Sequence, residues 1–167
     1  MSDTVDDRFT ALFRRYKNQV YDFAAGMLGD RDAAGDVVQE VFVRMYTQMR
    51  DGDDIAKPKN WLFTSIRNRC LNRIRDSRKY VRTEDLPQSS TTPNPGDGSR
   101  IILESALKSL DPGLKAALLL REYQELSYAE MAEVLGITVP AVRSLLYRAR
   151  NGLREAYFKL TAARRKE

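Results

Sequence analysis

Two stretches of this 167-residue chain place side chains suited to nucleic-acid contact on one face of a helix. The first stretch begins near residue 139, and a helical wheel separates an apolar back from a polar front. Side chains on that front can donate or accept hydrogen bonds: Arg143, Ser144, Tyr147, Arg148, Arg150 and Asn151, of which the first four are the candidate readers. A helix of this kind suits the major groove of DNA. The alternative is a solvated helix in an all-α bundle.

The second stretch is the helix expected from Trp61 to about Lys79, with Asn60 as its cap. One stripe of this helix carries an aromatic ring, two amides and other polar groups: Trp61, Ser65, Asn68, Asn72 and Arg75. Arginines stand on both sides of the stripe: Arg67, Arg69, Arg73 and Arg78. Aromatic rings stack on unpaired bases, amides contact base edges, and arginines hold phosphates. A tryptophan at a helix start is also common in protein cores, so the stripe is the more informative feature.

A third candidate surface lies on the helix expected over residues 33–49. Its outer face carries Asp36, Gln39, Glu40 and Val43. A single exposed valine is ordinary in globular proteins. The alternative interpretation is an acidic-rimmed patch that docks a protein partner.

Local signals define the elements that position the major-groove face. Ser127 and Glu130 form a capping box, which predicts a helix start at Tyr128. Gly136 suits the left-handed residue that ends this helix, and Thr138 suits the cap of the next one. The pattern predicts a helix-turn-helix, in which Leu145 packs at the edge of the apolar stripe.

The remaining pattern predicts an all-α protein with two small helical domains joined by a flexible linker. Residues 8–28 read as an amphipathic helix whose apolar face, including Phe9 and Phe13, belongs to a core. Further helices are expected over 101–110 and 114–123. We predict a first domain at 1–80, a Pro- and Ser-rich linker at 81–99, and a helix-turn-helix domain at 100–167.

The composition of the chain excludes several classes of function. The net charge is +5, with acids concentrated early and bases in two later stretches, which favours two contacts with a polyanion. Histidine is absent and Cys70 is the only cysteine, so we expect no disulfide framework, no metal site, no cofactor and no catalytic residue. No apolar run suits a membrane span and no leader is evident, so we expect a cytoplasmic protein without membrane insertion of its own.

Three segments in series resemble the extracytoplasmic-function (ECF) group of bacterial RNA polymerase sigma factors. They are DAAGDVVQEVFVRMY at 32–46, PKNWLFTSIRNRCLNRIR at 58–75 and LSYAEMAEVLGITVPAVRSLLYRAR at 126–150. The resemblance extends from about Phe9 to Leu160, and it implies a dissociable promoter-specificity subunit that is not an enzyme.

The resemblance also implies partners and residue roles. Core polymerase would bind through its β′ clamp helices and its β flap, and an anti-sigma factor is a further expected partner. The residues implied in docking the clamp helices are Asp36, Gln39, Glu40 and Val43. Those implied at the −10 promoter element are Asn60, Trp61, Ser65, Arg67, Asn68, Arg69, Asn72, Arg73 and Arg75. Those implied at the −35 element are Arg143, Ser144, Tyr147 and Arg148.

The sequence departs from the family pattern at three positions. Pro140 stands where the family often has glycine, Leu145 where it has a basic residue, and Asn72 where it frequently has aspartate. Two other functions remain open at this point. One is a helix-turn-helix regulator that binds an operator without polymerase, and the other is a sigma-like module that sequesters an anti-sigma factor.

Overall fold

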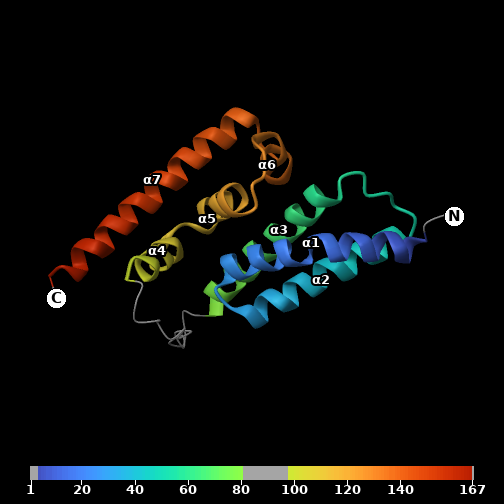
Figure 1. The fold of residues 1–167 in the computed structure, drawn as a ribbon, viewed down its shortest axis with the longest axis horizontal. Helices are drawn as coiled ribbons and strands as arrows, with labels where there is room; N and C mark the ends of the chain where they lie inside the picture. The colour runs from blue at the N-terminus through green and yellow to red at the C-terminus, as the bar shows by residue number, and fades with distance from the viewer. Residues whose placement is uncertain (1–3, 81–97, 167) are drawn as a thin grey trace. The chain divides into compact units, whose positions relative to one another are not determined.

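The computed structural model describes residues 4–80 and 98–166, and within them every regular element is helical. One compact unit contains α1 (Val5–Leu28), α2 (Arg31–Arg50) and α3 (Pro58–Tyr80) (Figure 1). A second contains α4 (Gly98–Ser109), α5 (Pro112–Leu118), the π-helical turn η1 (Leu119–Tyr123), α6 (Tyr128–Leu135) as far as Ala132, and α7 (Val139–Arg164). The predicted all-α class, with a helix-turn-helix in the second unit, is confirmed. The expected linker lies outside the described residues as far as residue 97, and residues 98 and 99 belong to α4.

Capping residues and a glycine determine where α1 begins and ends and where α2 begins. Thr4 and Asp7 form a capping box at the start of α1, and Gly29 ends that helix at φ 65°. A left-handed residue at this point favours glycine, which has no Cβ to clash. The Asp30 carboxylate then accepts from the backbone N–H groups of residues 32 and 33 and opens α2. The chain therefore reverses between α1 and α2, which pack side by side.

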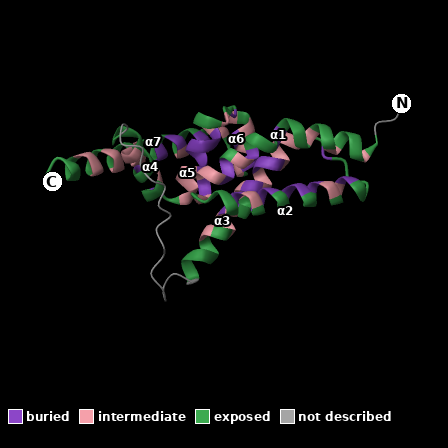
Figure 2. Ribbon diagram, turned by 60° about the horizontal axis from the view of Figure 1, so that its bottom comes forward, coloured by how far each residue is buried: buried purple, intermediate pink, exposed green. Residues whose placement is uncertain are grey.

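The core of the first unit forms where the apolar faces of the three helices meet (Figure 2). The fully buried side chains include Val20 and Phe23 of α1, Val41 and Met45 of α2, and Leu62, Phe63 and Ile66 of α3. The rings of Phe23 and Phe63 meet edge to face, with centroids 6.0 Å apart. Burying each large apolar side chain stabilises the fold by roughly 1.5–3 kcal/mol. This core fixes which faces of α2 and α3 remain exposed.

The start of α3 differs from the sequence prediction. Asn60 was expected to cap the helix, but α3 begins at Pro58, so Asn60 lies inside the first turn. The Trp61 N–H donates to the Lys57 carbonyl at 3.0 Å, which shows that the helix has begun before Asn60. Proline is tolerated in a first turn because its missing N–H would have no partner there.

In the second unit, the local signals of the helix-turn-helix are confirmed. The Ser127 hydroxyl accepts from the Glu130 N–H at 3.1 Å, and the Glu130 carboxylate accepts from the Ser127 N–H at 2.8 Å. Gly136 has φ 66°, and the Thr138 hydroxyl accepts from the Ala141 N–H at 3.3 Å. These caps define the ends of α6 and the start of α7.

The helix expected over 114–123 is instead α5 followed by η1. The Gln124 N–H donates to the Leu119 carbonyl, five residues back, at 3.1 Å. The chain then turns at Glu125, which has φ 55°. Wide turns of this kind often occur at functional sites. Here the turn brings Arg121 and Glu122 close to α6 and α7.

Close packing holds α7 against the earlier helices of its unit. Leu110, Leu118 and Ala149 form a buried cluster, and Leu153 packs against it. A Cβ added at Gly152 would stand 3.1 Å from Leu110 Cδ2, so glycine at this position lets α7 approach closely. The apolar back of α7 is therefore buried and its polar front faces outward.

Candidate polymerase and promoter interfaces

The outer face of α2 has the composition that the sequence predicted. All four candidate docking residues are exposed: Asp36, Gln39, Glu40 and Val43. Val43 is 58% exposed, although Phe42 beside it is buried. An apolar side chain this exposed, with carboxylates one and two turns away, provides a contact point for a partner.

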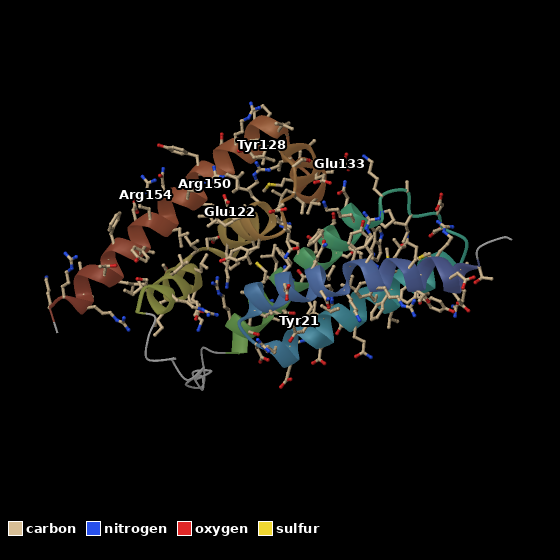
Figure 3. All side chains as sticks on the ribbon, viewed as in Figure 1. Tyr21, Glu122, Tyr128, Glu133, Arg150 and Arg154 are labelled. Carbon is tan, nitrogen blue, oxygen red and sulfur yellow. The ribbon has the colours of Figure 1, made fainter. Side chains whose placement is uncertain are left out.

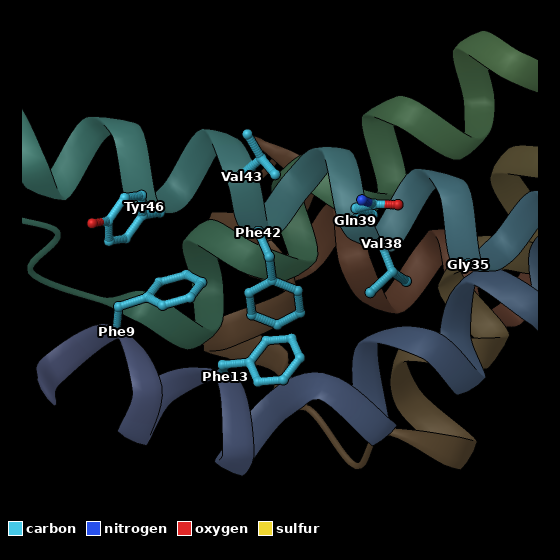
Figure 4. Close-up of a pocket in the computed structure, with 8 residues that line it drawn as sticks. All are labelled: Phe9, Phe13, Gly35, Val38, Gln39, Phe42, Val43 and Tyr46. Carbon is cyan, nitrogen blue, oxygen red and sulfur yellow. The ribbon is translucent and has the colours of Figure 1, made fainter. Parts of the chain in front are cut away.

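An apolar hollow of about 550 Å³ lies beside this face, between α1 and α2 (Figure 4). Its lining residues are Phe9, Phe13, Gly35, Val38, Gln39, Phe42, Val43 and Tyr46. The Phe13 and Phe42 rings meet edge to face with centroids 4.9 Å apart. The prediction that Phe13 belongs to a core is wrong, because its side chain is 37% exposed. The candidate docking surface therefore extends from α2 onto α1.

Ion pairs join the acidic residues of α2 to arginines of α3. Glu40 pairs with Arg69, and Asp36 lies 4.0 Å from the Arg73 guanidinium. The sequence interpretation placed the two acids and the two arginines on separate surfaces. In the structure the surfaces adjoin, so a charge change on one alters the electrostatic potential of the other.

A second hollow, of about 520 Å³ and largely polar, lies over the predicted stripe of α3. It is lined by Arg44, Trp61, Thr64, Ser65, Asn68, Arg69 and Asn72. Five of these residues belong to the predicted −10 set, so the structure brings the ring, the hydroxyl and the two amides together with one arginine. This combination can stack on an unpaired base, contact its edge and neutralise a phosphate.

Sequence reasoning missed two residues of this hollow, Thr64 of α3 and Arg44. Arg44 belongs to α2, and its Cζ atom stands 6.0 Å from the centroid of the Trp61 ring. A guanidinium at that distance is attracted to the face of the ring. The helical wheel of α3 carries no signal for Arg44, because the contact crosses from one helix to another.

The other predicted −10 residues lie outside this hollow. Asn60 is half-buried in the first turn of α3, Arg73 is near Asp36, and the Arg75 Nε lies 3.8 Å from Asp76. Arg67 is half-buried, its Nε has no hydrogen-bond partner, and burial lowers the pKa of its guanidinium. These four residues therefore stand around the hollow rather than in it.

The predicted front of α7 is exposed. Arg143, Ser144, Tyr147 and Arg148 all face outward, and the Tyr147 side chain is 69% exposed. Val142, Leu146 and Ala149 are buried behind them. Leu145 is half-buried, which agrees with its predicted place at the edge of the apolar stripe. Caps, packing and exposure together present one polar face of α7 to a ligand.

Residues 4–80 and 98–166 contain no group of three or more potential metal ligands from histidine, cysteine, aspartate and glutamate. In the same ranges, no helix combines the length and the apolar character that crossing a membrane requires.

Comparison with known proteins identifies both units. Residues 12–80 match the family Sigma-70 region 2, and residues 100–153 match Sigma-70, region 4. The chain is 31% identical to the ECF RNA polymerase sigma factor SigM of Bacillus subtilis over 160 residues, which cover 92% of this chain and 95% of SigM.

Two solved structures have a similar fold. The sigma factor RpoE of Bartonella quintana, crystallised with the anti-sigma factor NepR, has a TM-score of 0.68 and 22% identity, covering 89% of this chain and 96% of that one. CnrH, in complex with the cytosolic domain of CnrY, has a TM-score of 0.64 and 26% identity, covering 88% and 85%. On its two family matches and its identity with SigM, the chain belongs to the ECF family of RNA polymerase sigma factors, which are not enzymes.

Proposed function

We propose that the exposed surfaces of the two units divide the work of an ECF sigma factor among polymerase docking, −10 recognition and −35 recognition. The protein binds core RNA polymerase and promoter DNA, as its family does. The residue assignments below rest on the exposed faces of α2, α3 and α7.

The α2 face and the adjoining hollow are the proposed site for the β′ clamp helices of polymerase. Val43 and the aromatic wall of the hollow offer apolar area to a helix that packs on them. Asp36 and Glu40 at the rim favour basic residues on the partner. The β flap of polymerase is the proposed partner of the second unit.

The polar hollow of α3 is the proposed site for unpaired bases of the −10 element. Trp61 offers a ring for stacking, Asn68 and Asn72 offer amide groups for a base edge, and Arg69 neutralises phosphate. Arg73, Arg75 and the half-buried Arg67 contribute positive charge around it. This hollow is the observation that most favours a sigma factor over an operator-binding regulator. A regulator that binds double-stranded operator DNA does not need a site for unpaired bases.

The front of α7 is the proposed reader of the −35 element in the major groove. Arginine forms two hydrogen bonds with the O6 and N7 atoms of guanine, so Arg143 and Arg148 favour guanine in the site. Ser144 and Tyr147 supply further polar and apolar contacts. Each base contact is worth about 1–3 kcal/mol of discrimination, and arginine–phosphate contacts make the affinity salt-dependent.

We also propose an anti-sigma factor as an inhibitory partner, since a sigma factor of similar fold, RpoE of Bartonella quintana, is known in complex with the anti-sigma factor NepR. The proposed location is the cytoplasm, where polymerase acts. Each unit alone makes few base contacts, so specific DNA binding is expected to require polymerase to set the spacing between the units.

Replacement of Asn68, an exposed amide side chain of the α3 hollow, tests the proposed −10 site. Asn68→Ala should weaken the preference for one base of the −10 element by about 1–3 kcal/mol and leave the fold unchanged, because Asn68 is exposed. The measurement is the lifetime of open complexes formed by holoenzyme on promoters with each −10 base pair changed in turn. Asn18→Ala, an exposed amide of α1, is the matched control. Identical base preferences for Asn68→Ala and the wild type would remove Asn68 from the −10 site.

A further inference from the structure

Tyr128 lies among charged side chains from two other elements of the second unit, η1 and α7. It is the first residue of α6, and its side chain is half-buried. The capping box of Ser127 and Glu130 fixes the backbone at this point. Figure 3 shows Glu122, Tyr128 and Arg150 together where η1, α6 and α7 meet.

Two guanidinium groups lie against the Tyr128 ring. The Cζ atom of Arg121 stands 4.7 Å from the ring centroid, and the Cζ atom of Arg143 stands 5.9 Å from it. Both distances are within the range in which a cation is attracted to the ring face. Arg121 comes from the π turn, whereas Arg143 is one of the four exposed residues on the front of α7.

Residues of the π turn also lie close to Tyr128. Arg121 Nη1 donates to the Leu126 carbonyl at 2.8 Å, so its guanidinium is held by this bond as well as by the ring. Glu122 accepts from Arg150 Nη2 at 2.9 Å. That bond raises the pKa of Arg150, and the nearby Tyr128 side chain raises it further. Tyr128 is therefore held on several sides, and Arg143 is the exposed group that rests on it.

We propose that Tyr128 is a positioning residue for Arg143: its ring holds the guanidinium in place before DNA arrives and so sharpens base selection at the −35 element. This inference rests on the proposed −35 role of Arg143. A free arginine side chain loses rotamer freedom when it binds a base, and that loss weakens binding. A guanidinium already held against a ring loses less freedom.

The effect of Tyr128 should be confined to one base pair of the −35 element. Of the two arginines among the candidate readers on the described α7 front, Arg143 and Arg148, only Arg143 has its guanidinium over the Tyr128 ring. Loss of the ring should therefore affect the base pair that Arg143 contacts and leave the other −35 positions unchanged. A purely structural role for Tyr128 would instead weaken binding equally at every position.

The experiment compares Tyr128→Leu, Tyr128→Phe, Arg143→Ala and the double variant Tyr128→Leu with Arg143→Ala. Each full-length chain is assembled with core polymerase, and binding is measured on promoters with each −35 base pair changed in turn. Arg143→Ala identifies the position that Arg143 reads. At that position, Tyr128→Leu should reduce the preference about 3- to 10-fold, because the cation–ring attraction and the preorganisation are lost. Tyr128→Phe keeps the ring and should retain most of the preference, and the double variant should be no worse there than Arg143→Ala.

Two further measurements distinguish a folding defect from a loss of the proposed positioning role. Thermal melting reports whether Tyr128→Leu folds, and Tyr128→Met, which fills a similar volume without a ring, replaces it if it does not. In ¹⁵N-labelled free protein, the Arg143 Nε–H resonance should move when the ring is removed. An equal loss at all −35 positions, or an unchanged preference, would overturn the positioning role of Tyr128. Absence of any altered position in Arg143→Ala would instead overturn the proposed −35 role of Arg143.

Discussion

Val43→Asp should block the assembly of this sigma factor with core polymerase while leaving its fold intact. Val43 is 58% exposed on α2, so a carboxylate at this position stays solvated in the free protein. Docking would bury the same position beside the apolar hollow. Complete burial of a valine is worth about 1.5–3 kcal/mol, and the exposed part of Val43 still has roughly 1–2 kcal/mol of that to gain.

The substituted carboxylate adds a desolvation cost to this loss. A buried polar group without a hydrogen bond costs about 1–3 kcal/mol in proteins, and a charge costs more. Together the two effects should weaken binding by about 3 kcal/mol, or roughly a hundredfold in Kd.

Titration of fluorescently labelled protein with purified core polymerase measures this Kd directly. Thr47→Asp is the matched control, because Thr47 is exposed one turn further along α2 but does not line the hollow. Thermal melting should show no loss of stability in either variant. Binding of folded Val43→Asp with the affinity of the wild type would refute the docking surface.

Two further predictions follow from charge and backbone geometry. Glu40→Gln removes the ion pair with Arg69. It should change stability by less than about 1 kcal/mol, because both side chains are about half exposed. The released arginine should let the free protein bind single-stranded −10 DNA several-fold more tightly, by fluorescence anisotropy at low salt, with Asp22→Asn on α1 as control; equal affinities would show that Glu40 does not restrain Arg69. Gly35→Ala should stabilise the fold by about 0.5–1 kcal/mol, since Gly35 lies inside α2 and a Cβ there meets open space. A Cβ at Gly136 also meets open space, but the backbone there has φ 66°. Because residues with a Cβ disfavour this conformation, Gly136→Ala should destabilise the fold by about 1 kcal/mol. Thermal melting that gave both alanine variants the same sign would contradict this contrast.

The sequence predicted the features that depend on nearby residues. The Ser127 and Thr138 caps, the turn at Gly136 and the opposite faces of α2 and α7 each follow from spacing within about ten residues. Helical periodicity and capping act at that range, and the structure has them as expected. Asn60 was misassigned because a cap and a first-turn residue look alike when a proline precedes them by two positions.

Features that depend on packing between helices were not predictable. A wheel places Phe13 on an apolar stripe, but it cannot show that α2 covers this part of the stripe only in part. The contact of Arg44 with Trp61 and the pairing of Glu40 with Arg69 both join α2 to α3. The approach of Arg121 to Tyr128 depends on the π turn, for which the sequence has no recognised signal. These four features decide where the candidate surfaces lie and how they are coupled.

Run-off transcription with purified core polymerase tests the central claim most directly. Templates would carry promoters mapped upstream of transcripts that rise when this chain is expressed. We expect a specific transcript only when core polymerase and the chain are both present, and its loss when either the −35 or the −10 element is scrambled. Tight binding of the chain alone to a palindromic site, with no change in where polymerase starts transcription, would show that the chain acts as a regulator and not as a sigma factor.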